Sequence, residues 1–168
     1  MKFSTIAFAA GATAARYKRQ DTVFEVTNFS ASCIPHSTQC RLLDLIYSIG
    51  TVADDCLVSS YDFDVLEPGT MQTTPQHCAA MVSADGIGEL PALDNGECEQ
   101  TSKTFKIIKS FGGLALYVYE PVTPSSNKSG VYQIQTAELE TVVPAENPNG
   151  AHQVYKGPTS FPLTPQGM

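Results

Sequence analysis

The chain has 168 residues, which is enough for one domain with a core that can stand alone. Its 10 basic residues against 17 acidic ones argue against a nucleic-acid-binding surface, because such a surface needs clustered Lys and Arg to replace counterions. Charged residues make up only 16% of the chain, and it holds 12 Gly and 11 Pro. That composition favours short strands joined by many turns.

Residues 1–19 have the pattern of a secretory signal peptide followed by a processing site. Lys2 precedes a short apolar run, and the small residues Ala12-Thr13-Ala14 suit a signal peptidase. The apolar run is shorter than the ~20 residues of a membrane span, so we expect secretion and no membrane association. A buried amino-terminal helix is the alternative. Lys18-Arg19 forms a dibasic site typical of fungal secretion, and cleavage there would begin the mature, more acidic protein at Gln20.

Alternating and β-branched segments predict about seven short strands in an all-β fold, an antiparallel barrel or sandwich. The hairpin that joins the predicted strands Thr104–Lys109 and Leu114–Tyr119 across Ser110–Gly113 is the clearest. We place the domain at residues 20–157 and a disordered Pro-rich tail at residues 158–168. The predicted strands are Thr22–Phe29, Tyr61–Val65, Cys78–Ala84, Thr104–Lys109, Leu114–Tyr119, Val131–Gln135 and Gln153–Lys156; Cys33–Cys40, Pro91–Cys98 and Pro121–Gly130 are predicted loops and turns.

The cysteines of a secreted chain are first interpreted as disulfide partners. We predict two disulfides among Cys33, Cys40, Cys78 and Cys98. Pairing Cys33 with Cys40 and Cys78 with Cys98 gives the most local loops, but all three connectivities stay open. Each disulfide would stabilise the fold by ~2 to 4 kcal/mol. The fifth cysteine, Cys56, is left without a partner.

Residues 42–60 differ from the strand-like sequence on either side. The segment holds the helix-like run LLDLIYSIG and Cys56. Without this segment, Arg41 would be followed directly by Tyr61, so that a loop closed by two cysteines would continue into an alternating strand. An even number of cysteines would remain. We therefore interpret the segment as the in-frame translation of a retained intron, and peptides from it in the mature secreted protein would contradict this. The alternative is a genuine amphipathic helix, which would need a partner surface.

Zinc is the alternative interpretation of Cys33, His36, Cys40 and the adjacent pair His77-Cys78. Their spacing is not characteristic of a zinc site, and neighbouring ligands rarely converge on one ion. We therefore expect no metal and no other cofactor.

Catalytic patterns are weak. Three histidines are present, His36, His77 and His152, but no G-x-S-x-G nucleophile motif accompanies them. Asp62 and Asp64 share one face of a predicted strand, whereas a glycosidase pair comes from apposed elements. We expect no enzyme.

Two pairs of side chains on the predicted surface suggest other roles. Asn28-Phe29-Ser30 and Asn127-Lys128-Ser129 are N-glycosylation sequons, so Asn28 and Asn127 are candidate glycosylation sites. Tyr117 and Tyr119 share the outward face of one strand. They either line a binding surface or are ordinary exposed residues.

The sequence FEVTNFSASCIPHS, continued by Cys40-Arg41 and YDFDV and followed by Cys78-Ala79-Ala80 and Gly96-x-Cys98, resembles a family of small secreted fungal proteins. This is the Alternaria alternata major-allergen-like β-barrel family, which includes elicitors of the plant hypersensitive response. The resemblance spans Thr22 to about Lys156 and implies an extracellular barrel or sandwich with two disulfides, with no catalytic residues to transfer. The chain departs from the family at residues 42–60, and its cysteine spacing does not carry over a disulfide-linked dimer.

We therefore expect an extracellular glycoprotein that acts as an effector or elicitor by binding a host plant protein or a small apolar ligand. No nucleic-acid or membrane partner is expected, and a homodimer stays open. A secreted hydrolase or hydrolase inhibitor, and a cell-wall structural protein, are the alternatives.

Overall fold

The computed structural model of the protein describes residues 22–35, 57–84, 88–143, 145 and 151–166. The predicted signal peptide at residues 1–19 lies outside these residues, as do His36, Cys40 and Cys56. Among the described residues the only helical turn is the short 3₁₀ element η1, and no helix is long and apolar enough to cross a bilayer. The elements are β1 (Phe24–Pro35), β2 (Leu57–Leu66), β3 (Gln76–Ala84), β4 (Leu93–Cys98), β5 (Thr104–Ser110), β6 (Gly113–Thr123), β7 (Ser126–Gln135), η1 (Thr136–Glu138), β8 (Leu139–Val142), β9 (His152–Tyr155) and β10 (Phe161–Pro165).

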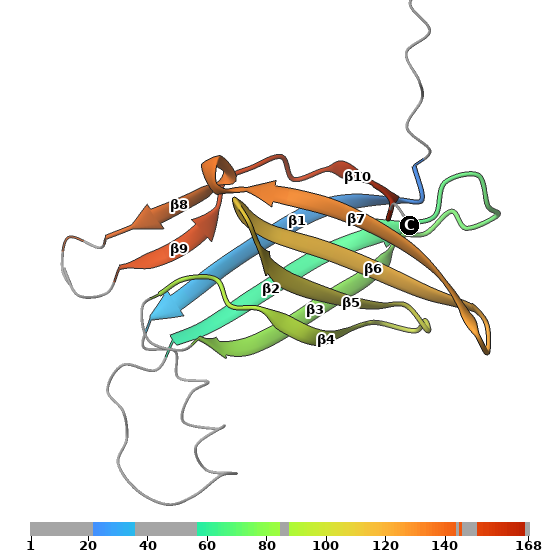
Figure 1. The fold of residues 1–168 in the computed structure, drawn as a ribbon, viewed down its shortest axis with the longest axis horizontal. Helices are drawn as coiled ribbons and strands as arrows, with labels where there is room; N and C mark the ends of the chain where they lie inside the picture. Colours follow the sequence, from blue (N-terminus) through green and yellow to red (C-terminus); the bar gives the residue numbers. More distant parts are fainter. Residues whose placement is uncertain (1–21, 36–56, 85–87, 144, 146–150, 167–168) are drawn as a thin grey trace, which may run out of the picture.

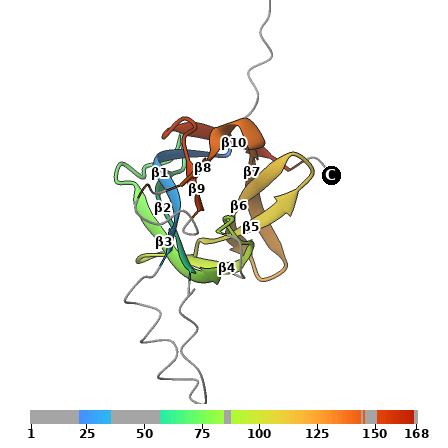
Figure 2. The ribbon, with the colours of Figure 1, turned by 90° about the vertical axis from the view of Figure 1, so that its left-hand side faces the viewer.

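Eight strands close into an antiparallel barrel. The hydrogen-bonded order runs β10-β7-β6-β5-β4-β3-β2-β1, and β10 pairs back onto β1 to complete the ring. Viewed from one end, the strands surround a common interior (Figure 2). The predicted antiparallel β-barrel is therefore confirmed, with more strands than the seven or so expected.

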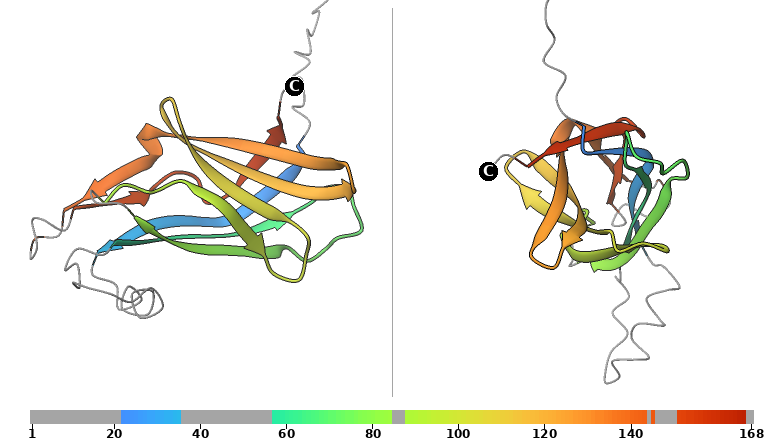
Figure 3. Two further views of the ribbon diagram at one scale, coloured as in Figure 1. Left: turned by 60° about the horizontal axis from the view of Figure 1, so that its bottom comes forward. Right: turned by 90° about the vertical axis from the view of Figure 1, so that its right-hand side faces the viewer.

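Strand β1 has different neighbours along its two halves. Its first half pairs with β10 through Phe24, Glu25 and Val26, whereas Ser32 near its other end pairs with Val154 of β9. A bulge between Thr27 and Ser30 separates the two halves. The β8–β9 hairpin consequently extends the wall beyond the closed ring (Figures 1 and 3).

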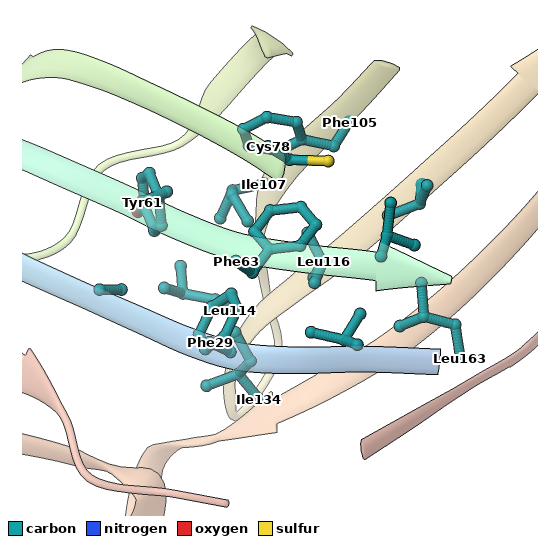
Figure 4. Packing of buried hydrophobic residues seen from close by; sticks show 14 of the residues in the cluster. Phe29, Tyr61, Phe63, Cys78, Phe105, Ile107, Leu114, Leu116, Ile134 and Leu163 are labelled. Atoms are coloured by element: carbon teal, nitrogen blue, oxygen red, sulfur yellow. The ribbon is translucent and has the colours of Figure 1, made fainter. Parts of the chain in front are cut away.

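Side chains from the inward faces of the barrel strands fill the interior, and Figure 4 shows 14 of them. In β2, Tyr61, Phe63 and Val65 are 1% exposed or less, as the alternation predicts. The ring of Phe63 lies 5.8 Å from that of Phe29 and 4.9 Å from that of Phe105, measured between centroids. An eight-stranded barrel is narrow enough for side chains to fill it, and the aromatic contacts do so here.

The prediction of a disordered tail at residues 158–168 is wrong for Phe161–Pro165, which form β10. Phe161 is 6% exposed and Leu163 is fully buried, so this short strand supplies two inward side chains to the core. Pro162 faces Glu25 of β1, and Pro165 faces Gly130 of β7. Proline lacks one hydrogen-bond donor, and it is accommodated because β10 pairs on only one side at each of these positions.

The amino-terminal part of β2 overlaps the segment interpreted as an insertion. Leu57 to Ser60 pair with both β1 and β3. Val58 is 3% exposed and Ser59 is fully buried. The predicted boundary at Ser60 therefore cuts into a strand of the barrel, and residues 57–60 belong to the fold. Residues 42–56 lie outside the described part of the chain.

The segment predicted as a turn at Pro91–Cys98 forms β4 over most of its length. Gly96 lies within this strand, and a Cβ atom built there would come within 2.3 Å of the Phe105 ring. The glycine therefore serves close packing between β4 and the core, which is why the Asn-Gly signal for a turn misled the prediction.

Candidate binding surface

Three side chains form an aromatic and cationic patch on the outer wall of the barrel. Tyr117 and Tyr119 come from β6, and Lys106 comes from the neighbouring strand β5. Leu116 and Val118 point inward and are fully buried, so the alternation of β6 directs the two tyrosines outward. Lys106 is the partner of Tyr117 in the β5–β6 register, which brings its side chain to the tyrosines. We call Lys106, Tyr117 and Tyr119 the tyrosine platform.

The geometry of the platform is regular. The two phenol rings are nearly parallel, with an angle of 9° between their planes and 6.2 Å between their centroids. The Lys106 ammonium lies 5.3 Å from each ring centroid, which places it over both rings. Each ring offers a π face that attracts a cation, and the partly exposed lysine adds a positive charge beside them. The surface suits an apolar or planar group that lies next to a carboxylate.

A second polar cluster lies on the outer face of β1, β2 and β3. Nδ1 of His77 is 3.2 Å from Asp64 Oδ1, and Nε2 of the same ring is 3.6 Å from Asp62 Oδ2. Asn28 donates a hydrogen bond from Nδ2 to Asp64 Oδ2 at 2.8 Å. The cluster therefore links three strands through polar contacts. His152, another of the three histidines, lies in β9.

No group of three or more His, Cys, Asp or Glu side chains placed to hold a metal ion occurs among the described residues. Cys78 forms a disulfide, so its thiolate is not available as the zinc ligand that the zinc alternative included, and His36 and Cys40 of that alternative lie outside the described residues.

The structure confirms one predicted disulfide and corrects the other. Cys78 of β3 is bonded to Cys98 of β4, two residues that face each other in the β3–β4 register. Cys33 instead carries a free, buried thiol. Its Sγ accepts a hydrogen bond from Ser59 Oγ at 3.0 Å, and burial raises the pKa of the thiol. Cys33 points into the barrel and is unpaired, and Cys40 lies outside the described residues.

The two sequons occupy different sites on the barrel. Asn28 is exposed at the β1 bulge with a backbone φ of 56°, a left-handed conformation that asparagine tolerates better than most residues. Its Nδ2, the atom that would carry a glycan, is hydrogen-bonded to Asp64. Asn127 is exposed in the β6–β7 hairpin opposite Pro121. Glycosylation of both residues stays a prediction, and only at Asn28 does the acceptor nitrogen form a hydrogen bond to another side chain.

A charged cluster of Glu67, Lys103, Glu120 and Lys128 lies beside the buried Phe24 ring. Lys103 is 3% exposed, and its Nζ lies 2.7 Å from Glu120 Oε1. Lys128 pairs with Glu67. The two ammonium groups lie 5.9 Å and 5.4 Å from the centroid of the buried Phe24 ring. Both ammonium groups therefore lie near the Phe24 ring, and each is paired with a glutamate. The charge of the buried Lys103 is neutralised by Glu120.

Glu67 makes the charged cluster sensitive to acid. The hydrogen bond from Lys128, opposed by burial and supported by the charges of Lys128 and Lys103, lowers the pKa of the Glu67 carboxyl. A carboxyl whose pKa is lower in the folded state contributes stability above its unfolded-state pKa of about 4.3, and this stability is lost as the pH falls.

We expect Glu67→Gln to lower the free energy of unfolding by roughly 1 kcal/mol at neutral pH. The difference between wild type and variant should shrink as the pH falls from about 6 to about 3, because protonation of the wild-type carboxyl removes the same ion pair. Urea unfolding across this pH range measures it. Glu140→Gln, in the exposed pair with Lys156, is the matched control. A difference that does not change with pH would contradict the prediction.

The two tyrosines could be identified from the sequence, whereas Lys106 and the charged cluster could not. Lys106 joins the platform only through the β5–β6 register. Lys103, directly before β5, and Glu120 of β6 are 17 residues apart in the sequence and meet only in the folded hairpin. Comparison of the chain with protein-family models, curated proteins and solved structures finds no match.

Proposed function

We propose that the protein is a secreted recognition protein, an effector or elicitor of the allergen-like β-barrel family, which binds a host plant protein without catalysis. The tyrosine platform is the observation that carries this proposal. Tyrosine is enriched where proteins bind one another, because it combines a rigid apolar ring with a polar tip. Here two such rings lie side by side on β6, with Lys106 of the paired strand β5 over both.

The filled interior favours a binding site on the outside of the barrel. Phe24, Phe63 and Leu116 are fully buried, and the rings of Phe63 and Phe105 are in edge-to-face contact. A small apolar ligand inside the barrel would have to displace these side chains, which costs packing contacts. This supports a protein partner over the small-ligand alternative.

The redox state and surface of the domain are compatible with an extracellular location. Disulfides such as Cys78–Cys98 are common in proteins of oxidising compartments, and the sequons are a second feature shared with secreted proteins. The resemblance to hypersensitive-response elicitors then supplies the class of partner, a plant protein outside the cell.

The proposal is tested by infiltrating the mature recombinant protein into leaves and scoring cell death and defence responses. We expect wild type to elicit a response and the Y117A/Y119A variant to lose it, because truncating a pair of hot-spot residues weakens binding by about thirtyfold or more. Phe111→Ala is the matched control, since this aromatic side chain is fully exposed on the same hairpin but lies outside the platform. A wild-type protein without effect, or a double variant as active as wild type, would contradict the proposal.

A further inference from the structure

The pairing between β3 and β4 ends early. It joins Cys78 with Cys98 and Ala79 with Glu97 and goes no further, whereas β3 continues to Ala84 and pairs with β2 along its whole length. Within the described part of the chain, the second half of β3 therefore has a neighbouring strand on only one side. We call Ala80–Ser83 the open edge.

The hydrogen-bond pattern identifies the free backbone groups. The His77 carbonyl accepts a bond from the Glu99 amide at 2.7 Å, so the backbone of His77 points toward β4. The N–H and C=O groups of every second residue in a strand point to the same side. Those of Met81 and Ser83 therefore also point toward the β4 side, where the register has no partner for them.

The departure of β4 has a local cause. Continuing the register would place Asn95 opposite Met81 and Leu93 opposite Ser83. Instead, the β4–β5 pairing shifts between Leu93 and Gly96, which is a bulge that bends the strand. Leu93 is only 9% exposed and belongs to the core cluster. Strand β4 is thus held by β5 and by the core, and it does not return to β3.

The open edge lacks the features that usually protect such edges. Lysine, proline or a bulge commonly blocks the addition of another strand, and the sequence Ala80–Ser83 contains none of these. Met81 is 62% exposed on the outer face, and Ser83 is exposed as well. On the inner face, Ala80 and Val82 are only partly buried against the core. A strand added here would find free hydrogen-bonding groups, an outer methionine and an apolar inner face.

The charges beside the open edge indicate which strand would fit. Asp94 and Glu97 of β4 are exposed, and neither carboxylate is paired with a cation among the described residues. They favour an incoming segment with basic residues on its outer face. A second copy of this acidic chain would bring its own Asp94 and Glu97 to the same place, which opposes self-pairing.

We propose that the open edge of β3 binds an extended, basic segment of a partner protein, which adds to the sheet as a further antiparallel strand. Residues of the segment that bond to Met81 and Ser83 carry their side chains on the outer face, beside Asp94 and Glu97. The alternating residues point inward, toward Ala80 and Val82. The surface is separate from the tyrosine platform and does not depend on the function proposed for it.

The probe is a blocked synthetic peptide of alternating Lys and Val, titrated into the full mature protein. We expect binding that protects the Met81 and Ser83 amides from hydrogen exchange. Methylating the backbone nitrogens of the lysines should abolish binding, because these N–H groups face β3. Methylating those of the valines should preserve it, because they face away. An alternating Glu-Val peptide should not bind.

Two protein variants locate the site. Ser83→Pro removes one edge N–H while leaving the β2 ladder intact, and we expect about tenfold weaker binding, equivalent to one lost hydrogen bond. D94K/E97K should shift the binding preference from the Lys-Val to the Glu-Val peptide. Both substitutions lie in β4, so the sequence of β3 itself stays unchanged. Y117A/Y119A should bind the peptide like wild type, which separates this site from the tyrosine platform.

Three outcomes would overturn the proposal. The first is slow exchange of the Met81 and Ser83 amides in the free protein, which would show that the edge is already covered. The second is equal binding of the Lys-Val and Glu-Val peptides. The third is a wild-type dimer in sedimentation that Ser83→Pro converts to a monomer, which would make a second copy the occupant.

Discussion

Deletion of residues 160–168 is expected to abolish the cooperative unfolding transition of the barrel. The deletion removes β10, the strand that pairs with both β1 and β7 and closes the ring. It also removes the buried side chains of Phe161 and Leu163 from the core. Loss of each such side chain costs about 3 to 5 kcal/mol. The combined loss matches a large part of the ~5 to 15 kcal/mol that stabilises a typical domain. Thermal unfolding followed by circular dichroism measures the effect.

Deletion of residues 166–168 alone is the control for this experiment. It leaves Phe161–Pro165 in place, so the melting temperature should stay within a few degrees of the wild-type value. A chain ending at residue 159 that still unfolds cooperatively, at a temperature close to wild type, would show that β10 does not stabilise the barrel.

The all-β fold could be predicted where each strand carries its own signal. The alternation of Tyr61, Phe63 and Val65 identifies the inward face of β2, and the two segments around Ser110–Gly113 form the β5–β6 hairpin. Prediction failed where a strand depends on its neighbours. In β10 the prolines suggested disorder, although the inward residues Phe161 and Leu163 alternate as a strand requires.

The candidate surfaces were predictable only in part, because register and strand order bring their residues together. Local spacing suggested a disulfide at Cys33, but the β1–β2 register places Cys33 opposite Ser59 inside the barrel. The tyrosines of the platform share one strand and were visible in the sequence, whereas Lys106 comes from the next strand. The open edge of β3 could not be predicted at all, since it arises from the bulge that turns β4 away.

Lys103→Ala is expected to lower the free energy of unfolding by about 3 to 5 kcal/mol. The Lys103 side chain is 3% exposed, so the loss of its ammonium leaves the Glu120 carboxylate without its partner at 2.7 Å. It also removes a positive charge near Glu67 and a cation beside the Phe24 ring. Removing one member of a buried pair costs more than the pair contributes, because the remaining charge is only partly hydrated. Urea unfolding at neutral pH gives the value.

Lys109→Ala is the matched control, since Lys109 also pairs with a glutamate. Its Nζ lies 3.0 Å from Glu89 Oε2, but the two side chains are 57% and 48% exposed. We expect this exposed pair to contribute about 1 kcal/mol or less. The K103M/E120Q variant separates charge from packing, because both charges of the pair are removed together. It should recover most of the lost stability. Equal effects of Lys103→Ala and Lys109→Ala would show that burial of the charged cluster does not determine its contribution.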